Sequence, residues 1–281
     1  MNEYSLTPVQ RIGGFWFKRD DLFQPFGRGQ VNGGKLRQCI MLVNGLHVPY
    51  SGLLTYCSIH SPQAPITAAV SLSKGLPCEV VYGGTKLGTL ARLPMPRLCM
   101  KYGARIHIAA RSGRHNILYA RARAIAEKTG AFIVQYGINI MDYRDVLLQA
   151  VARQVENIPD QIDDLIMVCG SGITSTGVMV GLKQYGKRVR RVHLVATAPD
   201  RQTFIHGNLQ QYGADRDFIY HSLFSQPGFS YERPVQASFG GIAFHPHYEA
   251  KMMQWLKGSG ITGGKVLIWI TGAEPGTAKR K

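Results

Sequence analysis

Short apolar segments alternate with amphipathic segments along most of the chain. The apolar segments have the length and residue types of buried strands, and the amphipathic segments repeat apolar residues at helical spacing. Strands are expected at residues 15–18, 53–57, 78–82, 106–109, 132–134, 164–168, 192–196 and 265–270, and helices at residues 35–43, 65–73, 94–102, 115–128, 143–154, 174–184 and 248–256. This alternation predicts an α/β protein with parallel-rich sheets covered by helices.

The same pattern predicts two intertwined lobes. The chain is expected to cross into a second lobe near Ser51 and to return near Tyr136. The larger lobe would then consist of residues 1–50 and 137–281, and the smaller lobe of residues 51–136. No internal repeat and no low-complexity linker interrupts the alternation.

The composition is that of a folded chain: 45% of the residues are hydrophobic and 18% are charged, which excludes disordered and fibrous classes. No apolar run reaches the roughly 18–20 residues that cross a bilayer, and the first ten residues lack the features of a signal peptide. The five cysteines are scattered and form no C-x-x-C pair, which favours reduced thiols. We therefore expect a soluble, cytoplasmic protein that does not contact a membrane.

The charge is the unusual feature of the composition. Thirty-three Lys and Arg residues against 17 Asp and Glu residues give a formal net charge of +16. Such an excess predicts attraction to a polyanion such as nucleic acid, whereas one bound phosphate would not account for it. The basic segments are residues 187–191, Arg111, Arg114, Arg121, Arg123 and residues 279–281. If several of them share one face around a binding site, they form a track for a polyanion.

Residues 164–182 read as an apolar strand, a turn rich in glycine and hydroxyl groups, and an apolar helix. Backbone N–H groups and hydroxyls at the start of a helix bind phosphate, because the helix dipole also favours an anion there. The candidate phosphate ligands are Gly170, Ser171, Gly172, Thr174, Ser175 and Thr176. The spacing matches neither a P-loop nor a G-x-G-x-x-G motif. A tight turn without a ligand is the alternative interpretation.

Lys35 follows two glycines at the start of a predicted helix, in Asn32-Gly33-Gly34-Lys35. A lysine with so little bulk beside it suits Schiff-base chemistry, in which the amine must approach a cofactor carbonyl. The alternative is a solvated lysine at a helix start. The segment Lys-Arg-Asp-Asp-Leu at residues 18–22 precedes this motif.

Together these segments resemble the fold-type II pyridoxal-phosphate-dependent enzymes, particularly the branch of D-cysteine desulfhydrase and aminocyclopropane-carboxylate deaminase. The order and spacing of the motifs agree over nearly the whole chain. The resemblance implies that pyridoxal 5′-phosphate is the cofactor and that Lys35 holds it through a Schiff base. It also implies that the six residues between Gly170 and Thr176 named above hold the cofactor phosphate.

Further residues take their expected roles from this resemblance. Ser61 and Gln63 match the family turn that binds the substrate carboxylate and lies over the cofactor, and His60 belongs to the same turn. Tyr231 matches the active-site tyrosine near the substrate. Thr271 matches a position on the closing strand where a hydroxyl faces the pyridine nitrogen. Lys35, Ser61 and Tyr231 are thus the expected catalytic residues.

The chain also departs from the family pattern. Pro62 stands where the family has an Asn that contacts the cofactor's ring oxygen, and Asn32 is a candidate replacement. Gly34 replaces an Asn before the lysine. Gly240 stands at the position of the family's late acidic residue, and His245 at that of an Asp before Pro. Loss of the acidic residue argues against the ring-opening deaminase reaction.

Two enzymatic functions follow from these features. The favoured one is a pyridoxal-phosphate-dependent decarboxylase that acts on an amino acid attached to a modified thymine in DNA, as in phage pathways that hypermodify thymidine. It accounts for the charge of +16, and it implies amino-acid-bearing DNA as partner and the host cytoplasm as location. The alternative is a deaminase or desulfhydrase of a free small amino acid. A non-catalytic descendant of the fold is a third interpretation. A homodimer is expected.

Two other patterns favour structural interpretations. His245 and His247 flank Pro246 without a third ligand at suitable spacing, so a surface loop is expected there and no metal site. Cys169 lies beside the glycine turn, where a small buried hydrophobic residue is expected rather than a nucleophile.

Overall fold

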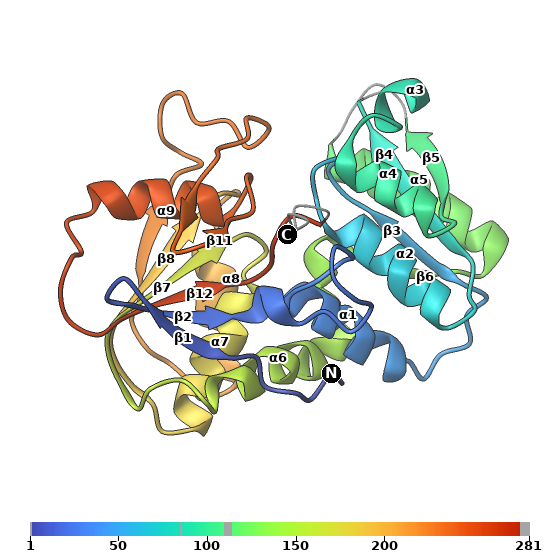
Figure 1. Ribbon diagram of the computed structural model, residues 1–281. Helices are drawn as coiled ribbons and strands as arrows, with labels where there is room; N and C mark the ends of the chain where they lie inside the picture. Colours follow the sequence, from blue (N-terminus) through green and yellow to red (C-terminus); the bar gives the residue numbers. More distant parts are fainter. Residues whose placement is uncertain (1, 85, 110–113, 276–281) are drawn as a thin grey trace. The chain divides into compact units, whose positions relative to one another are not determined.

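The computed structural model describes residues 2–84, 86–109 and 114–275 and divides into two compact units (Figure 1). The first unit consists of Met1–Arg37 and Asp145–Lys281, and the second of Gln38–Arg144. Each unit has its own parallel-rich sheet with helices against both faces, so the expected α/β class is confirmed.

The first unit contains a six-stranded sheet in the order β1-β2-β12-β7-β8-β9. Only β1 (Val9–Ile12) is antiparallel to its neighbour, β2 (Phe15–Arg19). The other strands, β12 (Val266–Ile270), β7 (Gln161–Cys169), β8 (Arg188–Ala196) and β9 (Ile219–Ser222), run parallel to one another and to β2. Parallel strands end at the same edge of a sheet, so β2, β12, β7 and β8 present their carboxyl ends side by side.

Alternating residues of these strands enter two separate cores. Leu165 and Met167 of β7 join Leu267 of β12 in a core under α7 (Ile173–Gln184), α8 (Gln202–Gln211) and α6 (Arg144–Ala152). Ile166 and Val168 enter the core on the opposite face, which α9 (Glu249–Gly258) covers. Because both faces are buried, β7 and β12 read as nearly continuous apolar runs in the sequence.

The second unit contains a four-stranded parallel sheet in the order β5-β4-β3-β6. Its strands are β5 (Arg105–Ala109), β4 (Cys78–Gly83), β3 (Leu53–Tyr56) and β6 (Phe132–Val134). The helices α2 (Gln63–Ser73) and α4 (Pro94–Lys101) supply one core, and α5 (His115–Thr129) supplies the other. The short α3 (Leu87–Leu90) precedes α4, and two 3-10 turns, Tyr136–Ile138 and Met141–Tyr143, follow β6.

The unit boundaries differ from the expected lobe boundaries. The helix α1 (Gly34–Asn44) begins in the first unit and continues into the second, and residues 38–50 and 137–144 belong to the second unit. Ring contacts explain this: Tyr50 and Tyr143 pack on Phe132 of β6, with ring centroids 6.4 and 6.0 Å away. These long-range contacts leave no periodic signal in the sequence.

The expected strands and helices all correspond to observed elements, with shifts of a few residues at their ends. Elements that the sequence did not predict are β1, β9, α3, α8 and the small antiparallel pair β10 (Ser238–Phe239) and β11 (Ile242–Ala243). These are short or half-exposed, so their apolar periodicity is weak.

Within residues 2–84, 86–109 and 114–275, no helix has the length and apolarity that a bilayer span needs.

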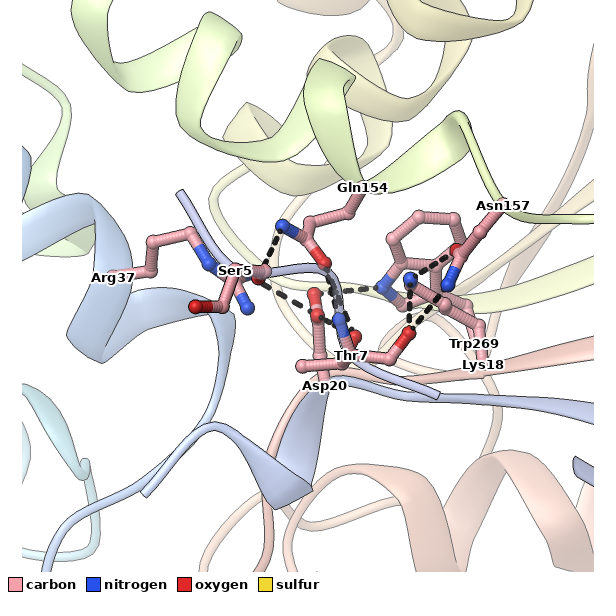
Figure 2. Close-up of polar contacts among 8 residues, drawn as sticks. All are labelled: Ser5, Thr7, Lys18, Asp20, Arg37, Gln154, Asn157 and Trp269. Carbon is pink, nitrogen blue, oxygen red and sulfur yellow. Dashed lines mark hydrogen bonds and ion pairs between the residues drawn. The ribbon is translucent and has the colours of Figure 1, made fainter. Parts of the chain in front are cut away.

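A buried polar network ties the start of the chain to the last strand (Figure 2). Asp20 is fully buried in the 3-10 turn Asp20–Leu22 that follows β2. Its carboxylate accepts hydrogen bonds from Thr7 Oγ1 (2.8 Å), Arg37 Nη1 (3.2 Å) and the indole Nε1 of Trp269 (3.2 Å). Arg37 lies on α1 two residues after Lys35, and its guanidinium also lies 4.3 Å from the Phe23 ring centroid. The carboxylate therefore fixes the first turn of α1 against β12.

Lys18 extends this network on the other side of Thr7. Its ammonium donates to the Thr7 carbonyl oxygen (2.8 Å) and to Asn157 Oδ1 (2.6 Å), and Gln154 Oε1 accepts from the Thr7 backbone N–H (2.9 Å). Burial lowers the pKa of Lys18 to about 8, although the Asp20 charge opposes this change. The Lys-Arg-Asp-Asp-Leu segment thus has a structural role that its sequence alone did not reveal.

Asp20→Asn should destabilise the first unit strongly, because it leaves the Arg37 guanidinium buried without its counter-charge. Removing one partner of a buried ion pair costs about 3–5 kcal/mol of the free energy of unfolding. Urea denaturation of the wild type and the variant would measure the difference.

Asp21→Asn is the matched control, since it removes the same charge from the next residue. Asp21 pairs with Arg19 (2.7 Å), which is partly exposed and also donates to Gln10 Oε1 (2.7 Å), so the control should lose less stability. Equal losses in the two variants would contradict the role given to Asp20.

Candidate active site

A glycine turn connects the end of β7 to the start of α7. Gly172 adopts the left-handed conformation (φ +88°), and a Cβ there would lie 2.9 Å from the Phe204 ring, so only glycine fits. At Gly170 a Cβ would meet no atom within 4 Å, so one side of the turn faces open space. Among the residues that the structure describes, no side chain caps the amino end of α7. The turn therefore presents helix N–H groups where an anion can approach.

The hydroxyls of this turn are not equivalent. Thr174 and Ser171 are half-buried, and Ser175 is buried beside the Cys169 thiol. Thr176 donates both its Oγ1 hydroxyl and its backbone N–H to the Gly172 carbonyl oxygen, at 2.9 Å each. Thr176 is therefore engaged within the helix, unlike the phosphate ligand expected from the sequence.

Thr197 belongs to the same region, and the sequence analysis missed it. It follows the last residue of β8, and its backbone N–H donates to the Cys169 carbonyl oxygen (3.1 Å). Its hydroxyl is buried and has no hydrogen-bond partner in the described part of the chain. Buried hydroxyls are nearly always paired, so this one fits a ligand oxygen. The signal in the sequence was a Thr directly after β8, the strand that pairs with β7.

Cys169 lies directly before the turn and is 1% exposed. Burial raises the pKa of its thiol to about 11, so the thiolate is scarcely populated at neutral pH. The expected structural role of Cys169 as a small buried residue is confirmed.

Lys35 and Thr271 are held together through the backbone. Gly33 adopts φ +92°, and a Cβ there would lie 2.3 Å from the Thr271 carbonyl oxygen. The Gly34 N–H donates to that same oxygen (2.8 Å). The helix start that carries Lys35 therefore lies against the end of β12, and the Lys35 side chain is half-buried. Gly33 is required by this close approach, whereas at Gly34 a Cβ would lie 3.0 Å from Asp20 Oδ2, so the two glycines meet steric limits and do more than provide the mobility expected for them.

Asn32, the candidate replacement for the family's ring-contacting Asn, uses its amide to bind the segment after β12. Asn32 Nδ2 donates to the Ala273 carbonyl oxygen (3.1 Å), and Asn32 Oδ1 accepts from the Ala273 N–H (2.8 Å). This pair of bonds closes the segment after β12 onto the loop before α1. Pro62, at the family's Asn position, precedes α2 in the second unit.

Glu249 is a second residue that the sequence analysis missed. It is 1% exposed in the first turn of α9. Its Oε1 accepts hydrogen bonds from the Thr271 N–H (2.9 Å) and from the Thr271 hydroxyl. Burial raises the pKa of Glu249 to about 7, against the opposing effect of these hydrogen bonds. When Glu249 is ionised, the Thr271 hydroxyl donates its hydrogen to this carboxylate. The lone pairs of the hydroxyl oxygen then remain available to accept a hydrogen bond from another group.

Tyr231 is anchored by contacts to its backbone and to its hydroxyl. Its carbonyl oxygen accepts from Lys251 Nζ (3.0 Å) and contacts His247 Nδ1 (2.9 Å), and its Oη lies 2.6 Å from the Tyr248 hydroxyl. Tyr248 immediately precedes Glu249, so this tyrosine pair adjoins the Glu249–Thr271 pair along the chain.

The expected surface loop at His245 and His247 is wrong. These side chains are 2% and 6% exposed, because they pack against Tyr248 and Tyr231 respectively. Within the part of the chain that the structure describes, no group of three or more candidate ligands could hold a metal ion.

The second unit contains Ser61, Gln63 and His60. Gln63 is fully buried: its Nε2 donates to Thr55 Oγ1 and to the Gln135 carbonyl oxygen (2.8 Å each), and its Oε1 accepts from the Gly137 N–H (2.7 Å). It cross-links the unit, so both ends of its amide are engaged within the protein. Ser61 Oγ accepts from the Gln63 N–H (3.3 Å), and His60 is half-buried.

The basic segment at residues 187–191 lies at the amino end of β8, whereas the Gly170–Gly172 turn lies at the carboxyl edge of the sheet. A nine-residue strand separates these edges by about 26–30 Å. This segment therefore does not surround the turn, as a track around the site would require. Arg114, Arg121 and Arg123 belong to the second unit, and Arg111 and residues 279–281 lie outside the described residues.

Comparison with known proteins shows what the chain is similar to. No family model matches it. An "O-seryl-dTMP PLP-dependent decarboxylase" of Salmonella phage ViI is 26% identical, and the match covers 97% of this chain and 82% of the relative.

Solved structures show the same fold at lower identity. An ACC deaminase homologue superposes with a TM-score of 0.76 at 21% identity, covering 97% of this chain and 91% of that one. Maize serine racemase gives a TM-score of 0.64 at 17% identity, with 95% and 88% covered. A pyridoxal 5′-phosphate-dependent aspartate racemase gives 0.58 at 13% identity, with 97% and 91% covered. The chain therefore has the fold of the fold-type II pyridoxal-phosphate-dependent enzymes, and over nearly its whole length it is similar to a phage decarboxylase that uses this cofactor.

Proposed function

We propose that the protein is a pyridoxal-phosphate-dependent decarboxylase whose substrate is an amino-acid group attached to a modified thymine in DNA. One observation carries this proposal. Neighbouring strands of the first unit present Lys35, Thr271, the Gly170–Gly172 turn and Thr197 at one carboxyl edge. That edge is where open α/β sheets bind their ligands. The similarity to the phage decarboxylase supports the choice of reaction.

The residues at this edge fit the cofactor. The open side of Gly170, the uncapped start of α7 and the unpaired Thr197 hydroxyl suit a phosphate. Thr174 and Ser171 would add donors to it. Lys35 would bind the cofactor covalently, and the Thr271 hydroxyl would contact its ring nitrogen. When bound, this cofactor supplies an electron sink for a bond broken at the α-carbon of an attached amino acid.

The side chains then have distinct tasks in decarboxylation. The bond between the α-carbon and the carboxylate breaks, carbon dioxide leaves, and a proton replaces it at the α-carbon. We assign delivery of that proton to the Lys35 amine, since a freed lysine is a natural general acid. Tyr231, paired with Tyr248, would contact the substrate. In the second unit, Ser61 and His60 keep the carboxylate-binding role that the family resemblance implies.

Two observations favour decarboxylation over deamination. The Gln63 amide is consumed inside the second unit, which removes one donor that would grip the carboxylate and retain it. At Gly240, where the family's acidic residue is expected, φ is +53° and a Cβ would lie 2.1 Å from Ile12 Cγ2. An acidic side chain does not fit there. The structural likeness to an ACC deaminase homologue keeps a deaminase or desulfhydrase of a free amino acid as the alternative.

A basic groove supports DNA as the partner. A cavity of about 670 Å³ at the amino edge of the sheet of the first unit is lined by Lys187, Arg188, Arg190, Arg216 and Lys265, with Asp163 as an acidic member. Arg188, Arg190 and Lys265 are exposed, whereas Lys187 is paired with Asp160 (2.7 Å). Exposed cations of this kind bind backbone phosphates without reading sequence. The amino-acid group on the base would then be selected at the carboxyl edge.

The proposal includes the cellular compartment and the oligomeric state of the protein. All five cysteines are buried and none of them is in a disulfide, which supports a reducing compartment such as the host cytoplasm. A homodimer is proposed from the family resemblance, and sedimentation would measure it.

Borohydride reduction of the cofactor-loaded protein should attach the cofactor to Lys35 and abolish the visible absorbance band. Lys35→Ala should lose both the label and the release of carbon dioxide, because it removes the amine next to Gly34, whose N–H bonds the Thr271 carbonyl oxygen just after β12. Peptide mapping would locate the label. A label that persists on another lysine in Lys35→Ala would refute the assignment.

Glu249→Gln should change how stability depends on pH. The pKa of Glu249 is about 7 in the folded protein, whereas its ordinary value of 4.5 applies to the unfolded chain. Between pH 4.5 and 7 the carboxyl group is therefore protonated in the folded state and ionised in the unfolded state. The free energy of unfolding of the wild type, relative to the variant, should therefore fall as pH rises from about 4.5 to 7, by on the order of 3 kcal/mol. Urea titrations at several pH values would measure it, and parallel curves for the two proteins would contradict the burial of a titrating Glu249.

Charge reversal in the basic groove should weaken DNA binding. Arg188→Glu with Arg190→Glu should lower affinity for duplex DNA and reduce the slope of log affinity against log salt by about two, since each removed phosphate contact lowers the slope by about one. The cofactor absorbance should not change. Lys74→Glu with Lys128→Glu, a pair of exposed residues of the second unit, has the same effect on net charge and is the control. Equal losses in both double variants would reject the groove as the DNA contact.

A further inference from the structure

A second cavity of the first unit lies between α9 and the segment of residues 223–235. Its volume is about 440 Å³, within the range of about 300–1,000 Å³ that is typical of small-ligand pockets. The side chains that give it its chemistry are Gln226, Phe229, Arg233, Lys251, Gln254 and Trp255. None of these residues was singled out by the sequence or used in the proposed chemistry.

Aromatic rings line this cavity, and neighbouring aromatic side chains pack against them. Trp255 and Phe229 are half-buried. His221 packs on Trp255 with a centroid distance of 4.3 Å, and Phe224 packs edge-on against Phe229 at 6.2 Å. Such supported aromatic faces are platforms on which nucleobases stack.

Polar groups at the cavity match the remaining parts of a nucleotide. Gln226 and Gln254 are exposed, and each amide offers donors and an acceptor to the edge of a base. Arg233 is exposed and provides the planar guanidinium that suits a phosphate. Among the described residues that line the cavity, none is acidic. This combination of aromatic rings, amides and an exposed guanidinium favours a nucleotide over an apolar or cationic ligand.

Lys251 connects the cavity to the candidate active site. It is 5% exposed, and its ammonium donates to the carbonyl oxygens of Ser230 (2.7 Å) and Tyr231 (3.0 Å). It also lies 4.7 Å from the Phe229 ring centroid and 5.6 Å from that of Tyr231. The residue that anchors Tyr231 therefore also forms part of the cavity lining.

We propose that this cavity binds a pyrimidine nucleotide of the nucleic acid that carries the amino-acid group. The base would stack on Trp255 and pack beside Phe229, the amides of Gln226 and Gln254 would contact its edge, and Arg233 would bind its phosphate. The proposal rests on the proposed function, because it gives the substrate's nucleotide a site beside Tyr231. It assigns substrate selection to contacts with the nucleotide, in addition to the amino-acid group.

The test is a titration of the cofactor-loaded protein with thymidine 5′-monophosphate and with thymidine, followed by calorimetry. Loading the cofactor occupies the phosphate-binding turn, so the nucleotide phosphate cannot bind there. Arg233→Gln should weaken binding of the monophosphate by about tenfold or more and leave thymidine unchanged, since charge-assisted phosphate contacts are lost. Trp255→Leu should weaken both ligands by about 5- to 150-fold, the value of one stacked base.

Gln254→Ala provides a variant of an exposed residue in case Trp255→Leu fails to fold, and it should weaken both ligands. Lys257→Gln is the matched control for Arg233→Gln, because it removes one exposed positive charge from α9 outside the cavity. The inference is overturned if the wild type does not bind the monophosphate, or if Arg233→Gln and Gln254→Ala bind it as tightly as Lys257→Gln does. The latter result is also expected if a partner protein, rather than a nucleotide, occupies the cavity.

Activity measurements separate this inference from the proposed function. If Arg233→Gln and Gln254→Ala release carbon dioxide from modified DNA with unchanged KM, the nucleotide site is wrong and the decarboxylase stands. If the variants lose nucleotide affinity as expected but the wild type releases no carbon dioxide, the reaction is wrong and the nucleotide site stands.

Discussion

The buried carboxylate of Asp20 is the interaction on which the first unit depends. It receives hydrogen bonds from the amino-terminal segment through Thr7, from α1 through Arg37, and from β12 through Trp269. These are the segments that bring the backbone around Lys35 against the end of the last strand. A buried ion pair contributes little net stability compared with an apolar replacement, but removing one of its partners leaves an uncompensated buried charge and costs about 3–5 kcal/mol. We infer that the position of Lys35 depends on this carboxylate.

The sheet then determines where chemistry can occur. Because β2, β12, β7 and β8 are adjacent and parallel, their carboxyl ends bring Lys35, Thr271, the Gly170–Gly172 turn and Thr197 to one edge. Glu249 adds a buried acid behind Thr271, and when it is ionised the Thr271 hydroxyl donates to it. The exposed cations of the basic groove lie at the amino edge, so the proposed DNA contact and the proposed chemistry use opposite edges of one sheet.

Sequence reasoning predicted the parts of the structure that leave a local signal. Apolar periodicity indicated the central strands and their helices, and the glycine turn before α7 was found from its residue types. Gln63 and Thr176 carried the family motif, but their hydrogen bonds are made within the protein, which no spacing reveals. Thr197, Glu249 and the cavity at Trp255 arise from contacts between segments far apart in the chain. The unit boundaries were displaced for the same reason, since Tyr50 and Tyr143 pack on β6.

The central claim is that the carboxylate removed by this protein belongs to an amino acid attached to DNA. Mass spectrometry of nucleosides digested from amino-acid-bearing DNA, before and after incubation with the cofactor-loaded protein, tests it most directly. The modified thymidine should lose the mass of one carbon dioxide and retain its nitrogen, and Lys35→Ala should leave it unchanged. An unaltered nucleoside, together with efficient turnover of free D-cysteine or a similar amino acid, would contradict the account.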